Sequence, residues 1–286
     1  MFSIIIPTFN NLQYLKCCIK SILDTSKLDN EIIVHVNDDL KGETRDYLNK
    51  NHIKYTFSKK NIGLCSSINL AVKSSSKRYI LYTHDDMYFC PGWENSLVNE
   101  INKINHTLFY ISGSMIEANS GHIPYDCGNS LESFDEEKLL NNYMNLNIDD
   151  HQGSHFSPHC VHIDVWNKVR GFSEEFNPGM GSDPDFNMKL WKIGVRIFKG
   201  LNSFKVYHFG SLTTRKNKNI IRNKGDLTFL KKWGISTKFF KKYYLKSDIK
   251  YTSELTEPKK NYKFLFFLLL CKINYLYVKY IYKLNS

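Results

Sequence analysis

The loop formed by His84, Asp85 and Asp86 has side chains that can bind a metal ion and a phosphate. The three residues follow one another directly after an apolar run. Two carboxylates on one loop can hold a hard divalent cation, which in turn binds phosphate oxygens. The alternatives are a solvated turn or a cap for the helix that follows Pro91-Gly92-Trp93. The loop is therefore a candidate metal and phosphate site.

Two further groups offer carboxylates at the end of a strand and at the start of a helix. Asp38, beside Asn37, can accept a hydrogen bond from a base imide or a ribose hydroxyl, although both residue types also favour turns without any ligand. Asp183 and Asp185 open an expected helix. There a carboxylate can be an N-cap, or a general base that removes a proton from an attacking hydroxyl.

Several histidines offer imidazole ligands in the second half of the chain. His208 follows an expected strand, where it is either a satisfied structural group or a ligand that completes the metal site begun by Asp86. Four others are grouped in the sequence: His151, His155, His159 and His162. Their spacing suits zinc ligands on a helix, but Gly153 and Pro158 would break that helix, so the sequence favours a loop beside the active site.

Alternating strands and helices in residues 1–82 position the first of these groups. Apolar, often β-branched runs predict four strands: Ser3–Ile6, Glu31–Val36, Ile53–Phe57 and Tyr79–Tyr82. Helical spacing or context predicts three helices between them: Asn11–Leu23, Thr44–Leu48 and Ile62–Val72. This alternation is typical of right-handed βαβ units and an α/β fold with a mostly parallel sheet. Ligands bind at the carboxyl ends of such strands, where Thr8, Asp38 and the His84–Asp86 loop fall.

The second half of the chain is less regular. Residues 111–160 predict one helix, Asp135–Met144, among loops. Beyond them we expect helices at Val165–Val169 and Asp183–Trp191, and strands at Val195–Lys199 and Phe204–Tyr207. Near residue 215 the composition changes to lysine and aromatic residues, which predicts a domain of residues 1–214 and an extension of residues 215–286.

The positive charge belongs to that extension. Residues 1–200 hold 20 Lys and Arg against 24 Asp and Glu, whereas residues 201–286 hold 19 against 4. An acidic body argues against a nucleic-acid-binding protein, so we expect no nucleic acid partner. The basic extension instead predicts contact with an anionic surface.

The end of the extension has the pattern of an interfacial helix. Lys272, Lys279 and Lys283 share one stripe of a helix, and the other faces carry aromatic and aliphatic residues. Such a helix lies on a membrane with its lysines at the headgroups. We expect residues 259–286 to contact an anionic membrane surface, and two alternatives stay open: packing on the catalytic domain, or the interface of a homo-oligomer.

The cysteines and the apolar segments suggest a compartment. The seven cysteines are scattered without a C-x-x-C pair, which is typical of reduced thiols in the cytosol. No secretory signal and no run of roughly 18 apolar residues is apparent. We therefore expect a cytoplasmic protein that is peripheral at the inner face of a membrane.

Six segments, in order, resemble the family 2 glycosyltransferases with the GT-A fold, over about residues 2–211. The segments are SIIIPTFNNLQYLKCCIKSIL, EIIVHVNDDLKGET, NIGLCSSIN, YILYTHDDMYFCPGW, VWNKVRGFSEEFNPGMGSDPDFNMKLWKIGVRIF and VYHFGS. The resemblance implies a nucleotide-sugar-binding half, about residues 1–110, and an acceptor half, about residues 111–214. It also implies an inverting, metal-assisted transfer from a UDP- or GDP-sugar to a hydroxyl of a glycan or lipid-linked acceptor.

The resemblance also implies roles for individual residues. Those implied to bind the donor are Pro7, Thr8, Asn10, Asn37, Asp38, Asn69 and Asp85. Those implied to bind Mn²⁺ or Mg²⁺ are Asp86, at the last position of the D-x-D motif, together with His84 and His208. Asp183 is implied to be the general base, with Asp185 as the second candidate. His159 and Trp166 are implied to flank the acceptor.

The sequence departs from the family pattern at two positions that matter for chemistry. His84 stands where the D-x-D motif has its first aspartate, and Ser182 stands where the family usually has glutamate. A neutral imidazole can still bind Mn²⁺. The alternative function is a GT-A-like module that binds a nucleotide or a glycan without turnover.

Overall fold

The computed structural model describes residues 1–210 and 222–280, so the predicted boundary near residue 215 and Lys283 lie outside the described residues. Its strands are β1 (Phe2–Phe9), β2 (Glu31–Asn37), β3 (Lys54–Ser58), β4 (Tyr79–Tyr82), β5 (Met87–Phe89), β6 (Phe109–Glu117), β7 (Ile123–Pro124), β8 (His151–Gln152), β9 (His159–His162) and β10 (Ile197–His208). Its helices are α1 (Leu12–Thr25), α2 (Glu43–Lys50), α3 (Leu64–Val72), α4 (Trp93–Lys103), α5 (Glu136–Asn142), α6 (Ile163–Val169), α7 (Ser182–Lys192), α9 (Arg222–Trp233), α10 (Thr237–Phe240) and α11 (Tyr262–Tyr280). Short helical turns are η1 (Tyr143–Asn145), η2 (Glu174–Phe176) and η3 (Lys241–Leu245).

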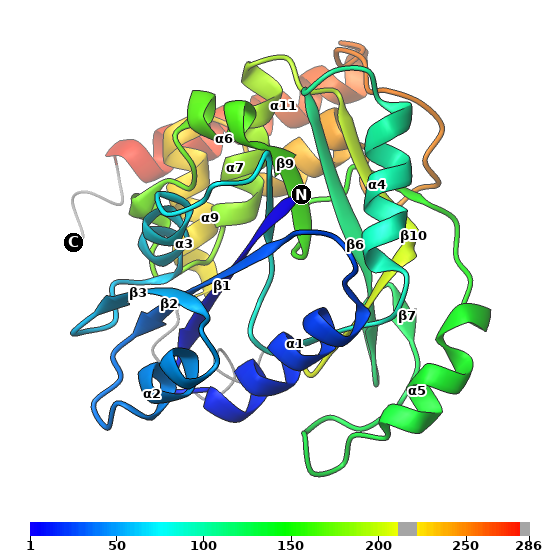
Figure 1. Cartoon of the computed structure of the whole chain (residues 1–286). Helices are drawn as coiled ribbons and strands as arrows, with labels where there is room; N and C mark the ends of the chain where they lie inside the picture. Colours follow the sequence, from blue (N-terminus) through cyan, green and yellow to red (C-terminus); the bar gives the residue numbers. More distant parts are fainter. Residues whose placement is uncertain (211–221, 281–286) are drawn as a thin grey trace.

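One sheet with the order β3-β2-β1-β4-β9-β6-β10-β5 forms the centre of the molecule (Figure 1). β1 is parallel to β2 and to β4, and β2 is parallel to β3. The alternating side chains of β1 explain why helices cover both faces. Ile5 packs in the cluster that contains α3 residues, whereas Ile4 and Ile6 pack in the cluster that contains α1 residues. The predicted α/β fold and the parallel first half are confirmed.

The second half adds antiparallel strands to this mostly parallel sheet, in which β10 is parallel to β6. β9 lies between β4 and β6 and is antiparallel to both, and β5 and β8 are antiparallel to β10. β6, β8 and β9 fall where the sequence predicted loops around one helix. The two strands expected at Val195–Lys199 and Phe204–Tyr207 are one strand, β10, whose pairing with β6 shifts between Leu201 and Lys205.

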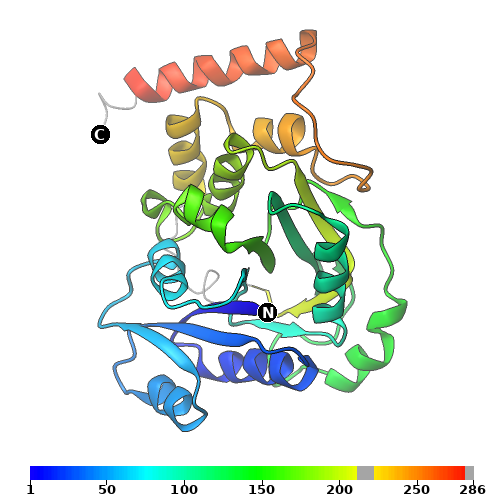
Figure 2. The same ribbon diagram turned by 45° about the horizontal axis from the view of Figure 1, so that its top comes forward.

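The basic extension shares the core of the catalytic region. Phe229, Phe239 and Phe240 lie in the same apolar cluster as Phe186 and Trp191 of α7. α11 lies along the outside of α9 and α10 as a straight helix at one end of the molecule (Figure 2). None of the helices in the described ranges combines the length and the apolar composition needed to cross a bilayer.

Candidate functional site

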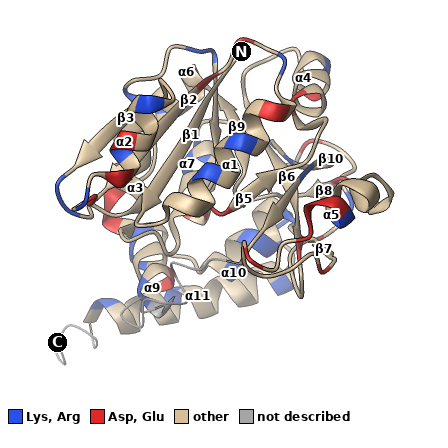
Figure 3. Ribbon diagram, turned by 60° about the horizontal axis from the view of Figure 1, so that its bottom comes forward, with Lys and Arg blue, Asp and Glu red and all other residues tan. Residues whose placement is uncertain are grey.

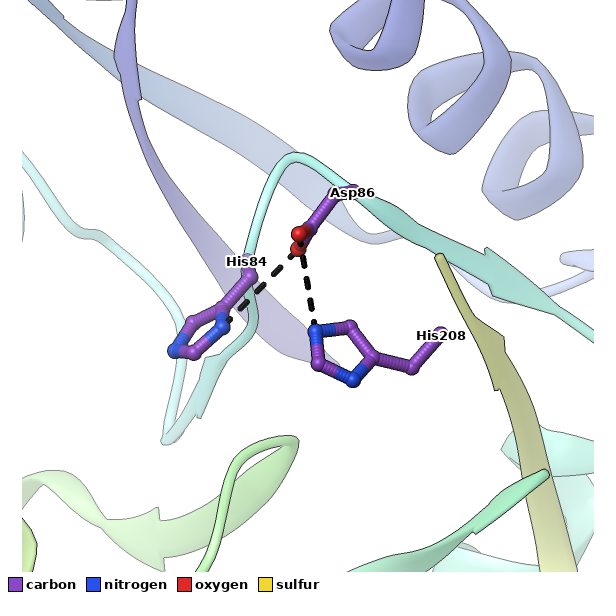
Figure 4. Close-up of side chains that lie close together, drawn as sticks. All are labelled: His84, Asp86 and His208. Atoms are coloured by element: carbon purple, nitrogen blue, oxygen red, sulfur yellow. Dashed lines mark ion pairs between the residues drawn. The ribbon is translucent and has the colours of Figure 1, made fainter. Parts of the chain in front are cut away.

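His84, Asp86 and His208 meet at the end of the sheet. Each offers one ligand atom, and the three atoms lie within 4.8 Å of one another (Figure 4). His84 and Asp86 belong to the loop between β4 and β5. His208 ends β10, and its antiparallel pairing with Met87 of β5 brings it beside Asp86. Residues far apart in the sequence therefore form one ligand set, as the sequence predicted for Asp86 and His208.

The geometry of this cluster fits a divalent cation. The Asp86 Oδ2 atom lies 3.5 Å from His208 Nε2, and Asp86 Oδ1 lies 3.9 Å from His84 Nδ1. Asp86 Oδ1 is buried without a hydrogen-bond partner among the described residues. Burying an unpaired carboxylate oxygen is costly, and a cation would satisfy it. Two imidazoles and a carboxylate suit Mn²⁺ better than Ca²⁺, which prefers oxygen ligands alone.

The charges around the cluster support the same interpretation. Burial alone would lower the pKa of His208, but its hydrogen bonds to Asp86 and Glu117 raise it to about 9. Burial would raise the pKa of Asp86, but His208 and then His84 lower it. Burial lowers the pKa of His84, so its imidazole is neutral and able to bind a metal. The imidazolium of His208 thus balances two carboxylates, and a bound cation would displace its proton.

The residues implied to bind the donor continue along the carboxyl ends of the parallel strands. The Thr8 hydroxyl donates a hydrogen bond of 2.6 Å to Asp85 Oδ2, and both side chains are buried. Burial and the neighbouring Asp86 carboxylate raise the pKa of Asp85. Pro7 is buried inside β1. The strand β1 therefore helps to fix the Asp85–Asp86 pair.

Asn10 and Asp38 follow β1 and β2 in an uncommon backbone conformation. Their φ angles are 51° and 47°, in the left-handed region that asparagine and aspartate tolerate better than most residues. Asn10 is exposed, and Asp38 Oδ1 is buried without a hydrogen-bond partner among the described residues. Strained residues with unpaired polar atoms are typical of ligand sites, which is consistent with the predicted role of Asp38.

The side-chain amides of Asn37 and Asn69 form hydrogen bonds with other residues of the protein. The Asn37 side chain donates to Ser67 Oγ at 2.7 Å and accepts from the Ile62 N–H at 3.0 Å. Asn69 donates to the Phe172 carbonyl and accepts from the Phe172 N–H, both at 2.8 Å. These bonds give both asparagines a positioning role in the structure, and the direct donor contacts implied for them stay predictions.

Asp183 lies in the first turn of α7, directly after a close crossing of two chain segments. Gly181 has a φ of 82°, and a Cβ there would come within 3.0 Å of the Gly225 backbone of α9. Glycine at position 181 therefore allows α9 of the extension to pass close to the start of α7. Burial raises the pKa of Asp183 to about 7, and the Lys241 ammonium of η3 opposes that shift. A half-buried carboxylate with a pKa near neutrality is suited to act as a general base.

Asp185, two residues on, has a different environment. It is fully buried, and its Oδ1 atom accepts a hydrogen bond of 2.8 Å from Trp233 Nε1 and pairs with Lys232 Nζ at 2.9 Å. Both partners belong to α9. Asp185 therefore connects α7 to the extension, and this geometry favours Asp183 over Asp185 as the base.

Tyr82 lies between the two carboxylate groups. Burial, then the charge of Asp183 and more weakly that of Asp86, raise the pKa of Tyr82 well above its usual value. Its ring centre lies 5.5 Å from that of His84 and 5.2 Å from that of His159. Its hydroxyl is buried without a hydrogen-bond partner among the described residues. The charges of Asp86 and Asp183, which belong to different halves of the fold, thus both raise the pKa of Tyr82.

The two residues implied to flank the acceptor are both buried. His159 is fully buried on β9, and neither of its ring nitrogens has a hydrogen-bond partner in the described part of the chain. Trp166 packs against Phe172 and Phe186, with ring centres 5.7 Å and 5.2 Å away. Trp166 therefore supports the core beneath the site, while the polar atoms of His159 are unpaired beside Tyr82.

Three residues of the candidate site are not predicted from the sequence: Glu117, Tyr82 and Lys241. Glu117 Oε1 lies 2.6 Å from His208 Nδ1 and orients that ring. Glu117 ends β6, a strand that the sequence analysis missed, and Lys241 lies in the extension that we treated as separate. Tyr82 ends a correctly predicted strand directly before the metal loop, and that position was an available signal.

The four grouped histidines do not share a helix: His151 lies in β8, and His159 and His162 lie in β9. In the described ranges, only His84, Asp86 and His208 gather as a set of three ligands. His151 instead stacks on His122, with ring centres 4.3 Å apart.

Comparisons with known proteins identify the family to which the chain belongs. The sequence profile of Glycosyl transferase family 2 matches residues 3–164. The chain is 26% identical over 245 residues to the hyaluronan synthase of Pasteurella multocida, covering 83% of this chain and 22% of that protein. It is 27% identical over 224 residues to the chondroitin synthase of Pasteurella multocida (strain Pm70), covering 76% and 22%. An uncharacterized glycosyltransferase of Rickettsia prowazekii is 32% identical over 143 residues, covering 49% and 44%.

Solved structures share the fold. The crystal structure of residues 1–349 of S. aureus TarS matches with a TM-score of 0.55 at 15% identity, over 79% of this chain and 68% of that chain. The same TarS fragment in complex with UDP-GlcNAc matches with a TM-score of 0.52 at 14% identity, over 79% and 69%. The chain spans less than half the length of each of the three curated relatives named above. Since the family profile covers more than half of the chain, the protein belongs to glycosyl transferase family 2.

Proposed function

We propose that this family 2 glycosyltransferase moves a sugar from a nucleoside diphosphate to an acceptor hydroxyl with inversion at the anomeric carbon. The observation that carries the proposal is the cluster of His84, Asp86 and His208 at the carboxyl edge of the sheet, with a buried Asp86 oxygen that lacks a partner. TarS, which shares the fold, has been solved with UDP and with UDP-GlcNAc, which supports a nucleotide-sugar donor.

In this proposal the donor nucleotide lies along the ends of β1, β2 and β4. The Asp38 carboxylate accepts hydrogen bonds from the base or the ribose, and Asn10 borders the same edge. Asp85, held by Thr8, faces the ribose or the diphosphate. When bound by His84, Asp86 and His208, a Mn²⁺ or Mg²⁺ ion would neutralise the negative charge on the diphosphate leaving group.

Asp183 is the proposed general base. Its carboxylate removes the proton of an acceptor hydroxyl as that oxygen bonds to the anomeric carbon. The bond from the same carbon to the diphosphate oxygen breaks on the opposite face, and the bonding electrons leave with the nucleoside diphosphate. Because burial raises the pKa of Asp183 to about 7, the group can both accept this proton and release it near neutral pH.

The acceptor is proposed to be a glycan or a lipid-linked hydroxyl near Tyr82 and His159. The Tyr82 hydroxyl and the ring nitrogens of His159 are fully buried polar atoms without hydrogen-bond partners among the described residues, which supports a polar ligand near them. The similarity to hyaluronan and chondroitin synthases is consistent with a sugar acceptor.

The experiment is a donor screen with product analysis. The full chain is incubated with UDP- and GDP-sugars, with and without Mn²⁺, and nucleotide release and the anomeric proton of the product are followed by NMR. We expect Mn²⁺-dependent release from one donor class and a product of opposite anomeric configuration. Retention of configuration would contradict the proposed mechanism. Binding without release from any donor would favour the alternative, a non-catalytic nucleotide- or glycan-binding module.

A further inference from the structure

The helix α11 buries only one stripe of its surface. Phe264, Cys271 and Val278 are buried, and Leu268 packs against the same apolar cluster. These positions recur at intervals of three, four or seven residues, so they lie on one face. That face contacts α9 and α10, and the rest of the helix is open (Figure 2).

The opposite side of α11 is apolar along the helix. Six of its side chains are each more than half exposed: Leu265, Phe266, Leu269, Ile273, Leu276 and Tyr277. A helix turns about 100° per residue, so Ile273 lies about 180° from the buried Phe264. A continuous apolar ridge of this kind marks a contact surface, because single exposed apolar residues are common whereas contiguous ones are not.

Lysines border this ridge on both sides. Lys272 and Lys279 lie between the buried stripe and the ridge on one flank, and Lys263 lies on the other flank. Lys242 of η3 adds a cation beside the second flank, with its Nζ atom 5.1 Å from the centre of the Phe267 ring. Residues 258–280 hold five lysines and no acidic residue, and Figure 3 shows basic residues recurring along α11.

We propose that this face of α11 docks on an anionic phospholipid surface, with the helix axis in the plane of the membrane. The ridge would enter the boundary between headgroups and acyl chains, and the flanking lysines would extend back to the phosphates. Tyrosines such as Tyr277 and Tyr280 suit the headgroup level. A helix interrupted by Lys272 at its middle fits an in-plane position.

The positive charge around α11 favours an anionic lipid surface over a second copy of the chain as the partner of this face. A two-fold contact through α11 would bring the same lysine-bordered ridge against itself. Residues 222–280 hold 14 Lys and Arg against 4 Asp and Glu, and among the described residues no acidic side chain pairs with Lys263, Lys272 or Lys279. Like charges would repel in such a dimer, whereas an anionic leaflet attracts each lysine by about 1 kcal/mol.

The docking face of α11 is connected to the catalytic region through α9 and α10. α9 and α10 contact both α7, which carries Asp183, and α11. If the proposed function holds, a lipid-linked acceptor in the same membrane would approach from the side of α7. The docking itself depends on the surface of α11 alone and does not require catalysis.

The test is co-sedimentation of the full chain with phosphatidylcholine vesicles, with and without phosphatidylglycerol. Two double variants alter only exposed side chains: Leu269→Gln/Ile273→Gln removes ridge area, and Lys272→Gln/Lys279→Gln removes charge. The matched control is Leu23→Gln/Met144→Gln, since these residues are 58% and 71% exposed on other parts of the surface. Unchanged melting temperatures would show that the variants fold.

We expect binding to the phosphatidylglycerol vesicles, a loss of at least about tenfold in the partition coefficient for both α11 variants, and no loss for the control. The proposal would be overturned if Leu269→Gln/Ile273→Gln bound the vesicles as tightly as the wild-type chain does. It would also be overturned if the wild-type chain bound neither kind of vesicle. Sedimentation velocity without lipid gives an independent result. A dimer that Leu269→Gln/Ile273→Gln dissociates would assign the face to self-association and would also overturn the proposal. Because no step measures sugar transfer, failure here leaves the proposed function untouched.

Discussion

The two halves of this molecule contribute to the candidate site in different ways. Residues 1–110 supply His84, Asp85 and Asp86 from a loop that directly follows a parallel strand, next to two other strand ends. Residues 111–280 supply His208, Asp183 and Lys241 from a strand end, a helix start and the basic extension. The proposed donor side thus combines residues of consecutive βαβ units with His208 from the second half, whereas the proposed acceptor side depends entirely on contacts between distant segments.

The donor side is tested most severely by Asp86→Asn. The substitution preserves the size of the side chain but removes the charge at the centre of the ligand set. We expect the rate of sugar transfer with saturating Mn²⁺ to fall at least about 10³-fold, because charge on the leaving diphosphate would be left unbalanced. Initial rates measure this, with Asp164→Asn as the control because its side chain is 77% exposed. A rate within tenfold of the native one would remove Asp86 from the mechanism.

The acceptor side is tested by comparing Asp183→Asn with Asp185→Asn on the same helix. Loss of the general base in Asp183→Asn should lower kcat about 10²–10⁴-fold. Asp185→Asn should leave kcat within about tenfold, since the Oδ1 atom of Asp185 is bonded to Trp233 and Lys232 of α9. Steady-state kinetics of both variants decides between them. The reverse order of effects would transfer the role of base to Asp185.

The pH dependence sharpens the same comparison. Burial raises the pKa of Asp183 to about 7, so kcat should rise about tenfold between pH 6 and pH 8 as the carboxylate loses its proton. Stability should change in the opposite direction. The folded protein holds this proton up to about pH 7, whereas the unfolded chain releases it near 3.8, the ordinary pKa of aspartate. The contribution of Asp183 to stability is therefore lost as pH rises from 4 to 7.

The urea midpoint of Asp183→Asn should therefore rise relative to that of the native chain as the pH rises from 5 to 8. Urea titrations followed by circular dichroism at the two pH values measure this difference. If the difference in free energy of unfolding between the native chain and Asp183→Asn were the same at both pH values, the fold would not disfavour the charged form of Asp183.

The smallest expected effect concerns the contact between α7 and the extension. Asp185→Asn weakens the pairing with Lys232 and should lower the free energy of unfolding by about 1–3 kcal/mol. Glu175→Gln removes the more exposed partner of the same lysine and should cost less than about 1 kcal/mol. Chemical denaturation of both variants gives the comparison. Equal losses would indicate that burial of Asp185 does not strengthen the contact.

The difference between the halves also explains what the sequence could predict. Ile4, Ile5 and Ile6 are buried on both faces of the sheet, and such β-branched runs predict strands directly. β9 reads His159-Cys160-Val161-His162, and β6 includes Ser112, Gly113 and Ser114, so neither run has a strong local preference. They form strands because neighbouring strands supply hydrogen bonds and burial.

The candidate site follows the same pattern. The approach of His208 to Asp86 was predicted, because the family resemblance placed both residues at the metal. The bond from Glu117 to His208 joins residues that are 91 positions apart in the sequence, and no local pattern reveals it. The effect of Lys241 on Asp183 likewise depends on the shared core that joins the extension to α7.

The central claim is that a cation held by His84, Asp86 and His208 connects the protein to the diphosphate of its donor. Isothermal titration calorimetry of the full chain with UDP and with GDP, each with and without Mn²⁺, tests it most directly. We expect one nucleotide to bind at least about tenfold more tightly with Mn²⁺, and Asp86→Asn to abolish this gain. Equal affinity with and without Mn²⁺, or a full Mn²⁺ effect in Asp86→Asn, would contradict it.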